Sequence, residues 1–350
     1  MKKIKIFNAV KICIIYSIVL SANSYLAQDI HFSQFDNSPL NLNPANTGSM
    51  NEDYRFSLNH KTQWNSISIP YATYSFSYDM AILKGANKKS HFGVGLLAFT
   101  DKAGTSEFKN SLYAISLSSS ISLNLNNKLA IGLQVGSGQK SVKYDQLSWD
   151  NQFSNGTFDS NLPSGESSIG QKKDYIDIST GILLYGNKNK VKYEYGASYF
   201  HVNNPKINFI ESNNDNLSAK ITAHGELTIQ LPENNTKPKS YLVPKFWYLR
   251  QGGHQEIYIG TLYETIIQGA AIYTTYRNEV KFGIGGYYRV GDAFIIATTF
   301  DHSHISLGIS YDINTSKLSE VSSFRGGIEV SLIYKSLYKS DKVKLIRSNE

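Results

Sequence analysis

Apolar and polar residues alternate along residues 111–138, which read SLYAISLSSSISLNLNNKLAIGLQVGSG. The odd positions are mostly large and apolar, as at Tyr113 and Ile115, whereas the even positions are mostly Ala, Ser, Gly, Asn or Gln. A period of two places these two sets on opposite faces of a β-strand. Asn126 and Asn127 interrupt the pattern, so the segment predicts two long strands joined by a tight turn.

Each arm of this hairpin is long enough to cross a lipid bilayer as a tilted strand. A membrane-spanning strand needs about 9–11 residues, whereas strands of soluble proteins average about five or six. The same alternation recurs in residues 175–185, 191–199, 304–312 and 328–334. The sequence has no run of about 18 apolar residues, so the pattern favours a membrane barrel of strands over a helical membrane protein.

Fifteen candidate strands can be placed along the chain. They begin near residues 54, 71, 91, 108, 128, 175, 191, 218, 240, 255, 269, 280, 293, 304 and 324. Both ends of a bacterial barrel normally lie in the periplasm, which requires an even number, and the weakest candidate is 269–276. We therefore predict an all-β fold, an outer-membrane antiparallel β-barrel of about 14 strands (range about 12–16), over residues 54–335.

Loop lengths predict how the barrel is oriented. The turns at Asn126–Asn127 and 186–190 are short, so we expect them to face the periplasm. The segments 141–174 and 202–217 are long, so we expect them to face the cell exterior.

The segment 141–174 is unusually long for a loop, and loops of this length usually have a function. It could bind a partner, plug the lumen or form variable surface. Its candidate partner-binding residues are Trp149, Phe153 and Phe158.

The first residues are typical of a secretory signal peptide. Four Lys precede or flank a nine-residue apolar core, Ile12–Leu20, which is too short to cross a membrane. We expect residues 1–27 to be removed by cleavage after Ala27. Cys13, the only cysteine, would leave with them, so the mature chain would have no disulfide. Losing the four Lys lowers the net charge from +7 to +3, and no nucleic-acid partner is implied.

Two further segments flank the predicted barrel. Residues 28–53 should form a short periplasmic lead-in to the first strand, and residues 336–350 a charged C-terminal tail. The lead-in is rich in turn-forming residues, and it could either guide the chain into the barrel or dock periplasmic partners. Docking would use apolar side chains that we expect to be exposed. The candidate partner-binding residues here are Phe32, Phe35, Leu40, Leu42, Asn43 and Pro44.

No arrangement typical of catalysis, cofactor binding or metal binding stands out. The eight His are scattered, and only His302 and His304 are close together, where we expect a turn. The sequence lacks a G-x-S-x-G motif, an H-E-x-x-H motif and a Walker loop. Gly-rich residues 283–286 lie inside a predicted strand and indicate close packing in the barrel wall. We therefore expect a protein that is not an enzyme and uses no cofactor or metal.

Residues 29–67, DIHFSQFDNSPLNLNPANTGSMNEDYRFSLNHKTQWNSI, carry the most specific motif in the chain. They resemble the opening of the PorP/SprF family of type IX secretion system membrane proteins, found in Bacteroidetes. Further similar segments are Pro70–Asp79, His201–Pro205, Gly308–Ile313 and Ser323–Tyr334. The resemblance covers nearly the whole mature chain.

The resemblance implies an accessory component of type IX secretion in the outer membrane. It would aid export or cell-surface attachment of specific cargo, such as large gliding adhesins, by recognition rather than catalysis. Its partners would be the type IX secretion machinery, a secreted adhesin-like cargo protein and outer-membrane lipid. The residues alone leave two alternatives open: a passive or ligand-selective outer-membrane pore, and a soluble secreted β-sandwich that binds a ligand.

Overall fold

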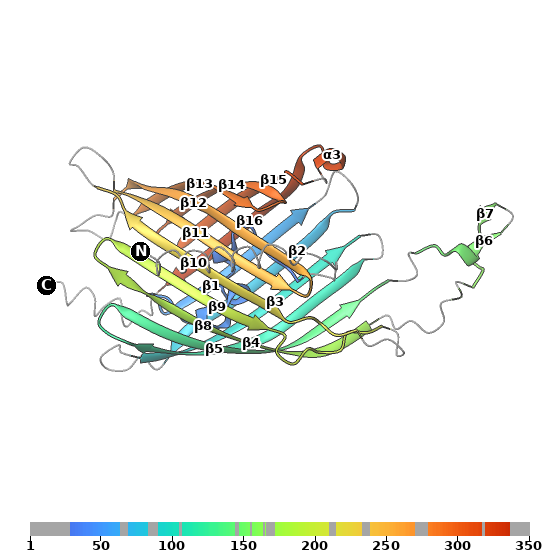
Figure 1. Cartoon of the computed structure of the whole chain (residues 1–350), viewed down its shortest axis with the longest axis horizontal. Helices are drawn as coiled ribbons and strands as arrows, with labels where there is room; N and C mark the ends of the chain where they lie inside the picture. Colours follow the sequence, from blue (N-terminus) through green and yellow to red (C-terminus); the bar gives the residue numbers. More distant parts are fainter. Residues whose placement is uncertain are drawn as a thin grey trace, which may run out of the picture.

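The computed structural model is a closed barrel of fourteen antiparallel strands, with a separate two-stranded sheet (Figure 1). The structure describes residues 29–63, 69–82, 90–104, 107–143, 147–154, 156–163, 165, 172–209, 215–232, 239–269, 279–316 and 319–336.

The barrel strands follow one another around the wall in chain order, and β1 pairs with β16 to close it. The strands are β1 (Tyr54–Gln63), β2 (Tyr71–Ile82), β3 (Ser90–Ala103), β4 (Phe108–Ser122), β5 (Asn127–Ser141), β8 (Lys172–Lys188), β9 (Val191–Phe200), β10 (Lys220–Gln230), β11 (Ser240–Gln251), β12 (His254–Gln268), β13 (Val280–Arg289), β14 (Ala293–His302), β15 (Ile305–Asn314) and β16 (Arg325–Ser336).

The predicted barrel is therefore confirmed, with fourteen strands over residues 54–336. A single closed sheet also excludes the soluble sandwich. Apart from Gly269, the doubtful candidate strand at 269–276 lies outside the described residues, as does the predicted signal peptide. Of the predicted C-terminal tail, only Ser336 is described, and it ends β16. Among the described residues, no helix is both long and apolar enough to span a membrane.

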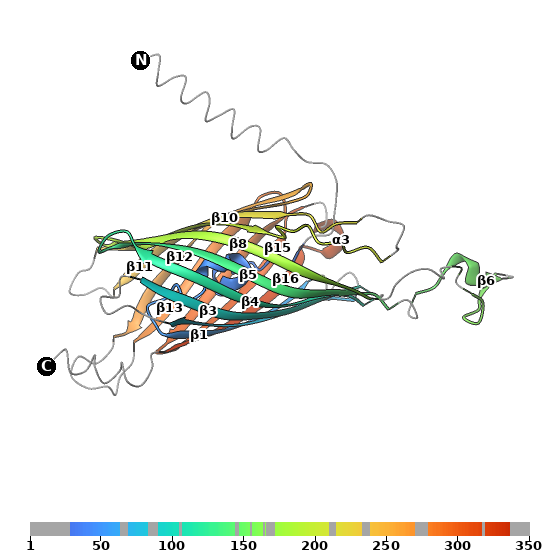
Figure 2. The same ribbon diagram turned by 90° about the horizontal axis from the view of Figure 1, so that it is seen from below.

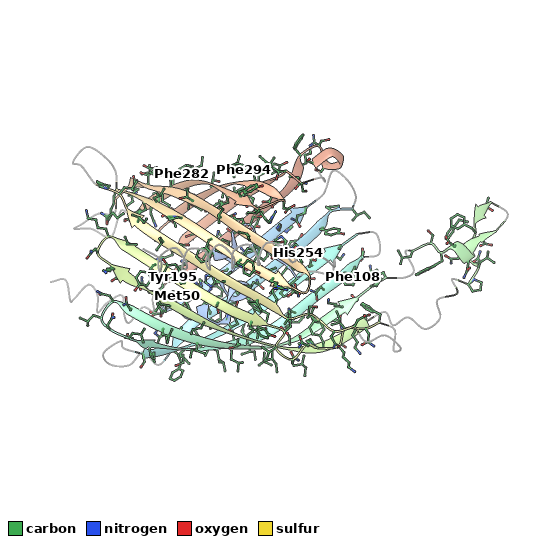
Figure 3. All side chains as sticks on the ribbon, viewed as in Figure 1. Met50, Phe108, Tyr195, His254, Phe282 and Phe294 are labelled. Atoms are coloured by element: carbon green, nitrogen blue, oxygen red, sulfur yellow. The ribbon has the colours of Figure 1, made fainter. Side chains whose placement is uncertain are left out.

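The two faces of the wall follow the alternation in the sequence. On β4, the side chains of Tyr113 and Ile115 are 67% and 57% exposed, whereas Ser116 is fully buried. Figure 3 shows Phe282 and Phe294 on the outside of the wall in the same way. An outward band of large apolar side chains is what a barrel presents to lipid.

The strand order separates two ends of the barrel. We call the end where β1 begins and β16 ends the terminal end, and the opposite end the loop end. Residues 123–126 and 189–190 form turns at the terminal end, whereas the long segments after β5 and β9 lie at the loop end. The two short turns and the two long segments that the sequence singles out therefore lie at opposite ends, as it predicts, although short turns also join β11 to β12 and β13 to β14 at the loop end.

The separate sheet consists of β6 (Phe153–Ser154) and β7 (Thr157–Phe158), which follow the short 3-10 helix η4 (Asp150–Gln152). Figure 1 shows both strands beyond the loop end, away from the barrel wall. The helix α3 (Ser319–Ser322) also lies at the loop end, between β15 and β16.

Candidate functional site

Residues 29–48 lie inside the barrel, and we call them the lumenal segment (Figure 2). They contain three short helices, η1 (Phe35–Asn37), α2 (Pro39–Leu42) and η2 (Pro44–Asn46). A proline begins both α2 and η2, where its fixed φ suits the first helical position. The side chain of Asn43 accepts a hydrogen bond from the Ala45 amide, which caps η2. Local turn chemistry thus folds this segment compactly enough to fit a lumen.

The placement of this segment corrects the expectation that residues 28–53 are a periplasmic lead-in with exposed apolar residues. Phe32, Phe35, Leu40 and Leu42 are at most 5% exposed, and Asn43 and Pro44 are also buried. The expectation was wrong because alternation shows which strand residues point inward but not what they meet there. In the described structure the lumen is therefore plugged by these residues, whereas the β6–β7 hairpin of the 141–174 loop lies outside it.

A charged cluster holds the start of the segment near the loop end. The Asp29 carboxylate is paired with the His201 ring and with the Lys220 ammonium, which lies 3.1 Å away. The other ring nitrogen of His201 lies 2.7 Å from Asp177. The Asp29 amide donates to the Gln251 side chain at 2.9 Å. The charged side chains in this cluster are at most 8% exposed, and each has an opposite charge beside it.

These contacts determine the charge states of the cluster. Burial alone would lower the pKa of His201, but the carboxylates of Asp29 and Asp177 raise it to about 9. Burial alone would raise the pKa of Asp29, but His201 and Lys220 hold it well below its usual value. At neutral pH the cluster therefore contains a protonated His201 between two carboxylates.

The next residues of the segment bind the wall through their backbone. The Glu329 carboxylate on β16 accepts the amides of Ser33 and Gln34 at 2.6 and 2.9 Å. The Ser33 hydroxyl donates to Asp312 on β15, and Asp312 is itself 2.6 Å from the Arg289 guanidinium. Two carboxylates from neighbouring strands therefore hold the backbone of the lumenal segment against the wall at Ser33 and Gln34.

A second ion pair holds the end of the segment near the terminal end. The Arg55 guanidinium on β1 pairs with Asp79 on β2 through two contacts of 2.9 Å. The same Asp79 accepts the Gly48 amide at 2.7 Å, and Arg55 donates to the Asn46 carbonyl at 3.0 Å. The segment thus runs through the lumen from the loop end towards the terminal end before the chain enters β1.

The lumenal segment lies so close to the barrel wall that two wall positions have room only for glycine. A Cβ on Gly132 would lie only 2.3 Å from the backbone of Pro44 and Ala45. A Cβ on Gly181 would lie 1.9 Å from the Asn43 side chain, whose amide donates to the carbonyl of Ile182. Side chains at these positions would displace the segment. The small residues on the inward face of β5 and β8 therefore make room for it.

Apolar clusters inside the barrel complete the binding of the segment. The Phe35 ring stacks on Trp247 and meets Tyr258 edge-on, with ring centroids 5.7 and 5.4 Å apart. Leu40 packs with Leu97 and Leu112 on the neighbouring strands β3 and β4. The lumen is therefore packed like a protein core around the segment.

The motifs on which the family resemblance depends meet at this one place. Residues 29–48 supply the segment. Arg55 comes from the same opening motif, and the other receiving residues come from the similar segments further along the chain. These receiving residues are Arg55, Asp79, His201, Asp312 and Glu329. Sequence reasoning did not assign them this role, because distant motifs show no contact until the barrel closes.

The expected partner-binding residues of the 141–174 loop form a small unit of their own beyond the loop end. Gln152 holds it together, because its side chain accepts from the Trp149 amide and donates to the Leu162 carbonyl. Phe153 and Phe158 pair across β6 and β7 with ring centroids 5.5 Å apart. Their side chains are 57% and 47% exposed.

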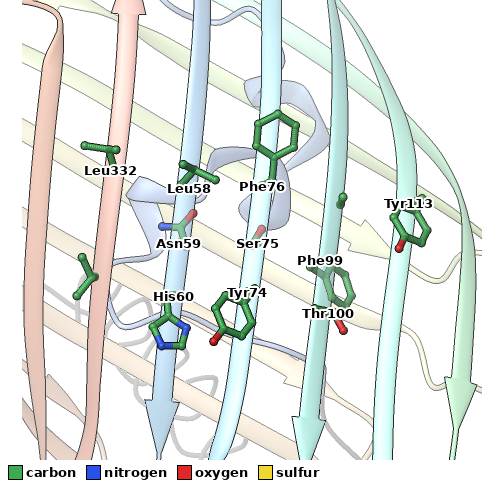
Figure 4. A pocket seen from close by; sticks show the side chains of 12 residues that line it. Leu58, Asn59, His60, Tyr74, Ser75, Phe76, Phe99, Thr100, Tyr113 and Leu332 are labelled. Carbon is green, nitrogen blue, oxygen red and sulfur yellow. The ribbon is translucent and has the colours of Figure 1, made fainter.

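A shallow pocket of about 350 Å³ lies on the outward face of β1–β4 and β16 (Figure 4). Leu58 and Phe76 line it, and the His60 ring stacks on Tyr74 at 4.3 Å. In Figure 4, Asn59 and Ser75 lie on the other side of the wall, where they bond Asn37 and Asn41 of the lumenal segment. The pocket is apolar and faces the lipid.

Within the part of the chain that the structure describes, no three His, Cys, Asp or Glu side chains are placed to hold a metal ion. The carboxylates of Asp29, Asp79, Asp312 and Glu329 instead bind cationic side chains or groups of the lumenal segment.

Several solved structures align with the chain over most of their length at low sequence identity. The toluene transporter TbuX of Ralstonia pickettii aligns at 11% identity over 87% of this chain and 94% of that chain, with a TM-score of 0.46. A FadL homologue of Pseudomonas aeruginosa aligns at 8% identity over 84% and 92%, with a TM-score of 0.43. The monoaromatic hydrocarbon channel TodX, as a deltaS2 mutant, aligns at 10% identity over 87% and 95%, with a TM-score of 0.45.

None of the curated protein sequences matches the chain significantly. The family profile described as "Type IX secretion system membrane protein PorP/SprF" matches residues 24–334, which is most of the chain. With its fourteen-strand barrel and outward apolar band, the chain is an outer-membrane protein and belongs to the PorP/SprF family of type IX secretion system membrane proteins.

Proposed function

We propose that this protein aids the export or cell-surface attachment of specific cargo, such as a large gliding adhesin, and that it does so by recognition rather than catalysis. Membership of the PorP/SprF family supports a role beside the type IX secretion machinery. The observation that carries the proposal is the exposed aromatic pair Phe153 and Phe158 on a hairpin beyond the loop end. Aromatic residues are enriched in protein interfaces and provide much of their binding energy.

The orientation of the barrel supports cargo recognition at the cell surface. In bacterial barrels the first strand normally begins, and the last strand ends, on the periplasmic side, and the longer loops face outward. Applied here, the rule places the terminal end in the periplasm, where the secretion machinery would contact it. The loop end and its hairpin then face the cargo.

The filled lumen favours this function over a passive or ligand-selective pore. Residues 29–48 lie buried among both charged and apolar residues of the wall. Planar-bilayer recording of the purified protein separates the two functions. We expect no steady wide conductance, whereas a stable open channel would support the pore.

Substitution of the aromatic pair tests recognition directly. The double variant Phe153→Ser/Phe158→Ser should abolish cargo display on intact cells, measured by mass spectrometry of surface and secreted proteins. The matched control is Phe324→Ser, because Phe324 is another exposed phenylalanine at the loop end, 62% accessible and outside the hairpin.

Heat-modifiable migration in electrophoresis should show that all variants form the barrel. Normal cargo display by the folded double variant would contradict the proposal, and so would an equal loss in the Phe324 control.

A further inference from the structure

A pocket of about 440 Å³ with both polar and apolar lining lies at the loop end, where β10 and β11 meet the segment after β9. Among the residues that line it are Asn204, Asn216, Ser218, Ile221, Arg250 and Gly252. The segment keeps its shape through backbone hydrogen bonds, from Leu217 to Pro205 and from Ile207 to Asp215. The pocket is therefore built from ordered backbone as well as from strand residues.

Arg250 is the charged residue of this pocket. Its neighbours Leu249 and Gln251 are buried in the lumen, so alternation turns Arg250 to the outer face of the wall, opposite Ile221 in the strand register. Its side chain is exposed, and none of the described carboxylates lies within ion-pair distance of it. An exposed guanidinium without a counter-ion is available to an external anion.

The position of Arg250 along β11 gives its depth relative to the membrane. The outward residues leading to it are Phe246 and Tyr248, and β11 ends one residue after Arg250. Phe246 is 41% exposed and Ile221 46%. Aromatic residues followed by a cation are typical of the boundary between acyl chains and headgroups, because the ring contacts apolar chains and the charge contacts phosphates.

We propose that this pocket binds the phosphate of a lipid headgroup in the membrane leaflet at the loop end. The Arg250 guanidinium presents two parallel N–H donors that match two phosphate oxygens. Asn204 and Asn216 line the same pocket, and an asparagine side chain carries a neutral N–H donor that can reach such a phosphate. Ile221 provides apolar contact for the start of an acyl chain, which a free phosphate would not use. The proposal does not depend on cargo recognition.

The test uses the full mature chain purified in a neutral detergent. Short-chain phosphatidylglycerol and inorganic phosphate are titrated separately, and binding is followed by native mass spectrometry. The variant Arg250→Gln should weaken phosphatidylglycerol binding by at least about tenfold, the loss expected for one charge-assisted contact. The control Lys206→Gln removes an exposed positive charge from the same segment but outside the pocket, and should leave binding unchanged.

Inorganic phosphate should bind far more weakly than the lipid, because it lacks the acyl contact. Equal binding of both ligands would overturn the lipid assignment and indicate a site for free phosphate. Unchanged lipid binding by Arg250→Gln, or an equal loss in the Lys206 control, would overturn the site itself.

Discussion

The lumenal segment and the β6–β7 hairpin look alike in sequence but lie in opposite environments. Both are turn-rich, lie outside the barrel strands and carry large apolar side chains. Phe35 in the segment is 4% exposed, whereas Phe153 in the hairpin is 57% exposed. The two regions differ in the contacts that the rest of the chain makes with them. The barrel supplies apolar and charged partners to the segment, whereas the two phenylalanine rings of the hairpin pair with each other and stay exposed.

The largest loss of stability should come from breaking the Arg55–Asp79 ion pair, which holds the end of the lumenal segment. Asp79→Ala leaves the buried Arg55 guanidinium without its partner and removes the acceptor of the Gly48 amide. Removal of one partner of a buried pair costs about 3–5 kcal/mol, and we expect a loss of that order. The free energy of unfolding, measured by urea titration in detergent, gives the value.

The double variant Arg55→Met/Asp79→Leu provides the control for this prediction. It leaves no unpaired charge, so it should lose clearly less stability than Asp79→Ala. Equal stability of Asp79→Ala and the wild type would show that the segment does not depend on this pair.

A smaller but more direct contrast comes from truncating one phenylalanine in each region. Phe35→Ala removes a ring packed between Trp247 and Tyr258 and should cost about 3 kcal/mol. Phe153→Ala removes an exposed ring and should change stability by no more than about 0.5 kcal/mol. Both values can be taken from the same urea titration. A comparable loss in the two variants would remove the distinction between a buried plug and an exposed hairpin.

The sequence predicted the barrel wall well because the wall obeys a local rule. Alternation with a period of two identified the strands that begin at Tyr54, Phe108 and Val191 at the observed residues. The number of strands followed from an even-number rule. Neither inference needed any knowledge of contacts between distant residues.

The lumenal segment could not be predicted in this way, because its partners come from strands far apart in the sequence. Asp79 and Glu329, which hold its two halves, are separated by most of the chain. One signal was present but not used. On β11 and β14, the inward positions Trp247, Leu249 and Ile295 are apolar as well as the outward ones. A strand that is apolar on both faces indicates a covered lumen.

The smallest expected effect is the change with pH in how firmly the charged cluster of Asp29, His201 and Lys220 holds the start of the lumenal segment. The pKa of His201 is raised above its usual value of 6.5 to about 9, so its stabilising charge is fully present below pH 6.5 and lost as the pH rises through 9. The pKa of Asp29 is lowered below 3.8, so its contribution is present above that value and lost as the pH falls further.

Protection of the amides of residues 29–34 should therefore be highest between about pH 4 and 6.5. Hydrogen exchange followed by mass spectrometry, corrected for the intrinsic pH dependence of exchange, measures this protection. His201→Gln should flatten the loss at high pH, whereas an unchanged profile in that variant would exclude His201 as its source.

The central claim is that residues 29–48 fill the lumen, and one engineered disulfide tests it most directly. The hydroxyl oxygens of Thr47 and Ser116 lie 2.6 Å apart, and the only cysteine, Cys13, lies in the segment expected to be cleaved. In Thr47→Cys/Ser116→Cys, mild oxidation of the folded protein should form the disulfide almost completely, as seen by mass spectrometry. The control Thr47→Cys/Ser310→Cys places the second thiol on β15, five strands away from β4, and should form none. Two free, reactive thiols in the first variant would contradict the claim.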